Sequence, residues 1–146
     1  MDIRNYEYIK FPNTDICGLF MRKHSPLAEN KVIKPQDILD IPLICSRQTL
    51  VREDISKWIG KDINNLNVVS SYNLIYNASL MVEEGVGYAL CLDKLINTTG
   101  DSALCFRPLE PRLEVEVYIV WKKSQIFSKT SKKFLEVLQM ELLEEI

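Results

Sequence analysis

The chain has 146 residues, of which 47% are hydrophobic and 26% charged, and its formal net charge at pH 7 is −2. This size and composition are typical of one soluble globular domain. The slightly acidic balance argues against binding of nucleic acid by this segment alone, and the lack of an 18-residue apolar run excludes a hydrophobic membrane span.

The N-terminal part of the chain predicts two strands and a helical turn. Tyr6–Phe11 alternates like a strand, and Pro12 is expected to end it in a turn. Ile16–Lys23 is more apolar and predicts a central strand. Ser25 and Pro26 then form the pattern of a helix N-cap and first helical residue.

The next part predicts a buried strand between helical segments. Lys34–Leu39 is expected to form a short helix, and Leu43–Cys45 a buried strand. The polar run Ser46–Thr49 follows as a turn, and Val51–Ile59 predicts a helix that Gly60 ends. Polar residues therefore stand directly after a buried strand.

The middle of the chain organises the predicted fold as strand, polar turn, helix and strand. The turn is Ser70–Asn73, with Asn73 as the expected N-cap of a helix that stops at Gly85 before the strand Tyr88–Leu92. Apolar residues of this helix recur on one face: Leu74, Ile75, Ala78, Met81 and Val82. Such a unit makes a right-handed crossover in a parallel sheet, where ligands bind beyond the carboxyl ends of the strands.

The C-terminal part predicts a helical turn at Lys94–Ile96, a strand at Ala103–Phe106 and the longest strand at Glu114–Lys123. One face of that long strand is apolar: Val115, Val117, Ile119 and Trp121. Ser128 is expected to cap a last helix that runs to about Glu145, with inward residues Phe134, Leu135, Leu138 and Leu142. Strands and helices mix throughout, so the predicted fold class is α/β.

Four cysteines lie in strand-like apolar runs, none in a Cys-x-x-Cys pair: Cys17, Cys45, Cys91 and Cys105. With His24 as the single histidine, a zinc site is not indicated, and we expect no metal and no cofactor. The thiols are interpreted as buried side chains in a reducing cytoplasm, with a redox role as the alternative. Met1–Asn5 lacks the features of a secretory signal, which agrees with a cytoplasmic location.

Four motifs in order resemble the LysR-type transcriptional regulators. Cys17–Ala28 is similar to the family's passage of a strand, a basic residue, a small residue and Pro-Leu-Ala, and Ile38–Ile44 to its segment that ends in Pro-Leu-Ile. Met81–Leu90 resembles the family's V-x-x-G-x-G-(I/Y)-A-L. Trp121–Leu135 resembles its closing strand, basic residue, serine and aromatic helix.

The resemblance implies an effector-binding domain of the type-2 periplasmic-binding-protein fold, in which two α/β lobes are joined by crossing strands. The family's winged helix-turn-helix and most of the first lobe have no counterpart, so residues 1–146 are expected to be a partial domain, mainly the second lobe. Residues 16–122 would form that lobe with the crossing strands. Residues 128–146 would form a terminal helix that packs on the first lobe.

The implied function is to sense a small metabolite and modulate transcription by a full-length homo-oligomer, which would contact DNA only through its helix-turn-helix. The alternative is a stand-alone solute-binding protein of the same fold. A small α/β enzyme would need a polar constellation with a perturbed ionisable group. The sequence shows none, and we expect neither catalysis nor a membrane partner.

Two polar clusters are the candidate effector contacts, and they follow neighbouring strands: Ser46, Arg47, Gln48 and Thr49, and then Ser71, Tyr72 and Asn73. Hydroxyls, backbone N–H groups and Arg47 would suit an anionic effector. The resemblance places Ser46, Arg47 and Gln48 in the family's effector cleft. Simple helix capping and a packed tyrosine remain the alternatives.

Overall fold

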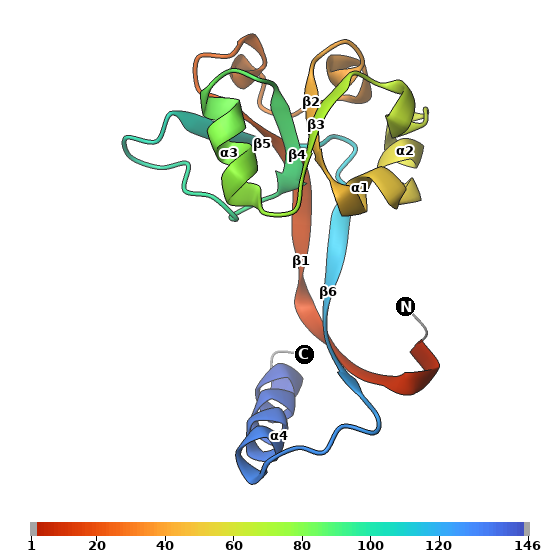
Figure 1. Cartoon of the computed structure of the whole chain (residues 1–146). Helices are drawn as coiled ribbons and strands as arrows, with labels where there is room; N and C mark the ends of the chain where they lie inside the picture. Colours follow the sequence, from red (N-terminus) through yellow and green to blue (C-terminus); the bar gives the residue numbers. More distant parts are fainter. Residues whose placement is uncertain (1–2, 145–146) are drawn as a thin grey trace. The chain divides into compact units, whose positions relative to one another are not determined.

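The computed structural model describes residues 3–144 (Figure 1). The chain divides into two compact units. Unit 1 comprises Met1–Asp15 and Val115–Ile146, as far as these are described, and unit 2 comprises Ile16–Glu114. No helix within residues 3–144 is both long and apolar enough to cross a membrane.

The strands of the described chain belong to one mixed sheet. They are β1 (Tyr6–Arg22), β2 (Leu43–Ser46), β3 (Val68–Tyr72), β4 (Tyr88–Leu92), β5 (Leu104–Pro108) and β6 (Glu114–Lys122). Their order is β3-β2-β4-β1-β5, and β6 pairs with β1. Because β2 is parallel to both β3 and β4, the predicted crossover from β3 to β4 is confirmed, with β2 between them.

The helices flank the sheet of unit 2. They are α1 (Arg47–Val51), α2 (Glu53–Ile59) and α3 (Ile75–Glu83), while α4 (Lys129–Glu144) belongs to unit 1. Short 3-10 turns occur at Ile3–Asn5, Pro26–Glu29, Pro35–Ile38 and Ile63–Asn65. In Figure 1, α3 lies on one side of the sheet, and α1 and α2 lie on the other.

The core lies in unit 2, which holds every buried hydrophobic residue of the described chain. Under α3, the core cluster consists of Phe20, Ile44, Ala78, Val82, Ala89, Cys91 and Leu104. The second half of β1 is central in the sheet, paired with β4 and β5 on its two edges, and Cys17–Met21 is buried throughout, as its continuously apolar sequence requires. Removal of these side chains from water is the main term that stabilises the unit.

The predicted break at Pro12 is wrong, since β1 runs without interruption from Tyr6 to Arg22. The pairings with β4 and β5 involve only residues from Cys17 onward, so Pro12 lies where the strand pairs with neither. Proline lacks a backbone N–H and is tolerated where that group has no ladder partner. β1 is consequently the longest strand, not β6.

Four further local predictions are corrected. No turn occurs at Ser46–Thr49, since Ser46 ends β2 and Arg47 begins α1, which Arg52 separates from α2. Ser70–Tyr72 continues strand β3, and Leu74, not Asn73, is the N-cap of α3. Lys94–Ile96 forms a turn and no helix. Leu74 and Phe134 were expected to face inward but are exposed, at 67% and 63%.

Unit 1 contains the first part of β1, most of β6, and α4. Tyr8 on β1 and Tyr118 on β6 form an edge-to-face pair with ring centroids 5.6 Å apart. Ser128 caps α4 by accepting a hydrogen bond from the backbone N–H of Ser131 at 3.1 Å, as predicted. The predicted apolar face of β6 is only half-buried. Residues 145 and 146, within the predicted last helix, lie outside the described chain.

Candidate functional site

The two predicted polar clusters meet at the carboxyl edge of the sheet in unit 2. β2 and β3 are parallel neighbours, and the last residues of the two strands, Ser46 and Tyr72, are paired. The preceding pair is Cys45 with Ser71. Since the carboxyl ends of adjacent parallel strands lie together, the segments Ser46–Thr49 and Ser71–Asn73 leave the sheet side by side.

Ser46 and Thr49 use their hydroxyls to cap α1. The backbone N–H of Thr49 donates to the Oγ of Ser46 at 3.0 Å, and the two hydroxyl oxygens are 2.8 Å apart. Both side chains are half-buried. The capping alternative is therefore realised for Ser46, and effector contact by these hydroxyls stays a prediction.

Arg47 and Gln48 are exposed on the first turn of α1. Within residues 3–144, neither side chain has a hydrogen bond or ion pair. The guanidinium of Arg47 is thus a cation with unused donors beside the ends of β2 and β3. A guanidinium in this state can bind a carboxylate or phosphate through two parallel hydrogen bonds.

Tyr72 is anchored within the protein. Its hydroxyl donates to the backbone carbonyl of Leu90 at 2.7 Å, and its ring packs against the core cluster under α3. Burial, with a smaller contribution from nearby thiols led by Cys91, raises the pKa of Tyr72 far above its ordinary value. These contacts favour the alternative in which Tyr72 is a packed structural side chain.

Ser71 and Asn73 are exposed beside Tyr72, and within the described chain their side chains make no hydrogen bond. The N-cap of α3, Leu74, has no side chain that could satisfy the first N–H groups of the helix. The edge therefore offers hydroxyl, amide and backbone donors next to the Arg47 guanidinium.

The cysteines are reduced and buried. Burial raises the pKa of the Cys45 thiol to about 12, and it also raises the pKa of Cys91 well above its ordinary value. For Cys105, burial likewise raises the pKa. A thiol with a raised pKa is a poor nucleophile and metal ligand. Across residues 3–144, no three His, Cys, Asp or Glu side chains are grouped closely enough to hold a metal ion.

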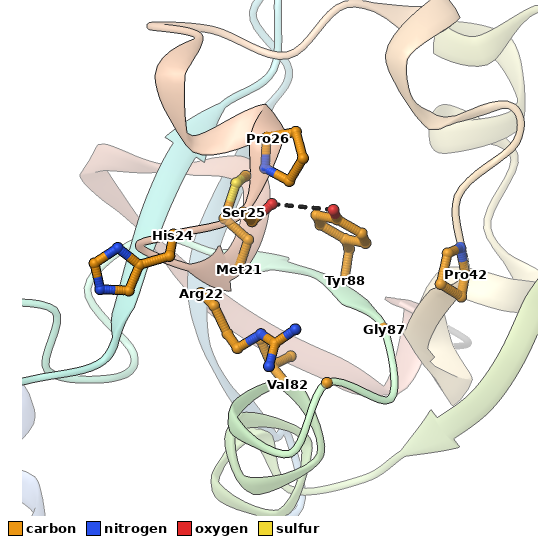
Figure 2. A pocket seen from close by; sticks show the side chains of 10 residues that line it. Met21, Arg22, His24, Ser25, Pro26, Pro42, Val82, Gly87 and Tyr88 are labelled. Carbon is orange, nitrogen blue, oxygen red and sulfur yellow. Dashed lines mark hydrogen bonds between the residues drawn. The ribbon is translucent and has the colours of Figure 1, made fainter.

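Sequence reasoning missed a pocket at the opposite edge of the same sheet (Figure 2). It has a volume of about 240 Å³ and includes Arg22, His24, Ser25 and Tyr88 in its lining. The predicted cap, Ser25, makes no capping hydrogen bond; its hydroxyl instead donates to the Tyr88 hydroxyl at 3.0 Å. The sequence signal is the basic run Arg22-Lys23-His24 directly before Ser25-Pro26.

Comparisons with known proteins identify related folds. The family model described as LysR substrate binding domain matches residues 7–143. The effector-binding domain of QuiR, in complex with shikimate, gives a TM-score of 0.78 at 17% identity, over 98% of this chain and 68% of that one. The CcmR regulatory domain from Synechocystis PCC6803, in complex with 2-PG, gives a TM-score of 0.73 at 15% identity, over 94% of this chain and 67% of that one.

A longer regulator matches as well. HinK, a LysR family transcriptional regulator from Pseudomonas aeruginosa, gives a TM-score of 0.72 at 16% identity, over 94% of this chain and 49% of HinK. The chain thus spans about half the length of that regulator. No curated protein sequence matches the chain. The predicted α/β, periplasmic-binding-protein-like fold is confirmed by the family match and these structures.

Proposed function

The chain belongs to the LysR substrate-binding domain family, and from this premise we propose that it is the ligand-sensing part of a transcriptional regulator. The match over residues 7–143 carries the proposal, because it accounts for nearly all of the described chain. A small-molecule effector would bind at the carboxyl edge of β2 and β3. Its binding energy would then shift the conformational equilibrium of the whole protein.

The proposed effector is anionic. Support comes from Arg47, whose guanidinium has no partner in the described chain, and from the exposed polar groups of Gln48, Ser71 and Asn73. The related QuiR domain binds shikimate, which is a carboxylate. Arg47 would pair with the anionic group. Ser46, Thr49 and Tyr72 would stabilise the backbone at the ends of β2 and β3.

The remaining roles belong to the whole protein. We place DNA binding in a helix-turn-helix outside residues 1–146, and we propose a cytoplasmic homo-oligomer. Residues 16–122 would be the second lobe with its crossing strands, and 128–146 the helix that packs on the first lobe. The solute-binding alternative is not favoured, since the matching domains are those of regulators. The family is one of ligand-binding regulatory domains, and we propose no catalysis.

A thermal-shift screen of the chain against carboxylate and phosphate metabolites tests this function. A compound that raises the melting temperature is then titrated calorimetrically into Arg47→Gln and into the control Lys61→Gln, which changes an exposed lysine away from the edge. Loss of a charge-assisted pair predicts about tenfold weaker binding for Arg47→Gln. Equal weakening in both variants, or none, would contradict the assigned role.

A further inference from the structure

The pocket introduced above, here named the Arg22 pocket, lies at the edge of the sheet opposite the proposed effector site. It is formed where β1 ends, at Met21 and Arg22, and where β4 begins, at Gly87 and Tyr88. β1 and β4 are antiparallel, so these two ends lie together, and Pro42 precedes the parallel strand β2 beside them. All lining residues belong to unit 2.

The cation of this pocket is Arg22, an exposed side chain without a hydrogen bond or ion pair within residues 3–144. Its guanidinium lies flat against Gly85. A Cβ added there would be 3.1 Å from both terminal nitrogens, and the backbone φ of +80° already disfavours a side chain. Figure 2 shows Arg22 directed toward the space beside Tyr88 and Val82, whereas His24 points away. The competing interpretation is a purely structural role, in which the positive charge of Arg22 offsets the partial negative charge at the carboxyl end of α3.

A second donor stands across from the guanidinium. The Tyr88 hydroxyl accepts the hydrogen bond from Ser25 at 3.0 Å, so its own proton is available to a ligand. An O–H that accepts one hydrogen bond donates the next one more strongly. Arg22 and Tyr88 therefore line the same pocket with two available donors.

Among the other lining residues, Pro26 and Pro42 present apolar surface, whereas Met21 and Val82 are fully buried beneath the lining, at 0% and 1% exposed. The volume of about 240 Å³ is larger than the cavity of roughly 150 Å³ that can hold benzene, so a compact organic molecule fits. One guanidinium, one hydroxyl donor and two proline rings together fit a small organic carboxylate.

We propose that the Arg22 pocket is a second ligand site that binds a small organic carboxylate. The carboxylate pairs with the Arg22 guanidinium and accepts a hydrogen bond from Tyr88, and the hydrocarbon body lies against Pro26 and Pro42. The site is separate from the carboxyl edge and does not depend on the function proposed for it.

The test uses cyclohexanecarboxylate and its neutral amide, cyclohexanecarboxamide, titrated into the isotopically labelled 146-residue chain and followed by NMR. The carboxylate is expected to shift the amide signals of Arg22, Gly85, Gly87 and Tyr88, and to bind about tenfold more tightly than the amide. Arg22→Gln should weaken binding about tenfold and Tyr88→Phe several-fold. Lys61→Gln should leave it unchanged.

Several outcomes overturn the proposal. If Arg22→Gln and the parent chain bound the carboxylate with equal affinity, Arg22 would have only its structural role. The melting temperature of Arg22→Gln is measured separately by circular dichroism. Tyr88→Phe keeps the ring and tests the donor in a folded background. Shifts confined to Ser46–Asn73, or no saturable binding at millimolar probe, would also refute the second site.

Discussion

Replacement of Gly18 by alanine should be among the most damaging single-methyl changes in the chain. Gly18 is buried in β1 between Cys91 of β4 and Pro108 of β5. An added Cβ would lie 2.1 Å from the Cζ of Phe106 and 2.5 Å from the carbonyl oxygen of Arg107. Both distances are far below van der Waals contact, so the chain must move.

The surroundings can relax only in part. The Phe106 ring is held edge-to-face against Phe20, with centroids 5.9 Å apart. The backbone at Arg107 is tied down because its guanidinium donates to the carbonyls of Ala28 and Asn30 at 2.7 and 2.8 Å. Overpacking of this kind costs 1–3 kcal/mol, and with a backbone atom in the clash we expect about 3 kcal/mol for Gly18→Ala.

Urea denaturation followed by circular dichroism measures this loss, with Gly60→Ala as the control. Unlike Gly18, Gly60 has a positive φ, +77°, and it has nothing within 4 Å of an added Cβ, so only backbone strain of about 1 kcal/mol is expected. In a double-mutant cycle with Phe106→Ala, the combined loss should be about 1 kcal/mol smaller than the sum of the two single losses, because removal of the ring relieves its contact with the added Cβ. A Gly18→Ala loss no larger than that of Gly60→Ala would refute the packing argument.

Two further changes test other parts of the account. Tyr72→Phe removes the hydrogen bond to the Leu90 carbonyl and should lower the free energy of unfolding by about 1 kcal/mol in the same denaturation assay; an unchanged midpoint would contradict the anchoring role. The folded pKa of Cys45, raised from 9.0 to about 12, predicts that stability falls as pH rises between these values, because the unfolded thiol ionises first. Cys45→Ala should flatten that decline in pH-dependent melting curves, and an identical slope in both proteins would count against it.

The organising unit of the fold was predictable because its signals are local. The apolar period of α3, the left-handed Gly85 and the apolar run of β4 lie within one stretch of chain, and each is confirmed except that Leu74 is exposed. The crossover rule predicted that β3 and β4 are parallel, whereas the place of β2 between them comes from the structure. Strand length was less predictable: whether Pro12 breaks β1 depends on which edges of the strand are paired, and that is set by residues distant in sequence.

The candidate site was predictable in place but not in detail. The sequence placed both polar clusters after parallel strands, and the register brings Ser46 beside Tyr72. Sequence alone could not predict the hydrogen bond from the Tyr72 hydroxyl to the Leu90 carbonyl, or that from the Ser25 hydroxyl to Tyr88. In both cases the partner lies far along the chain. The Arg22 pocket was missed for the same reason.

The most direct test of the central claim is an NMR titration of the isotopically labelled chain with the anionic compound that the thermal-shift screen selects. We predict that the largest amide shifts fall on Ser46–Thr49 and Ser71–Asn73, and that Arg47→Gln reduces them at equal ligand concentration. Shifts that leave both segments unaffected while the compound binds would contradict an effector site at the carboxyl edge of β2 and β3.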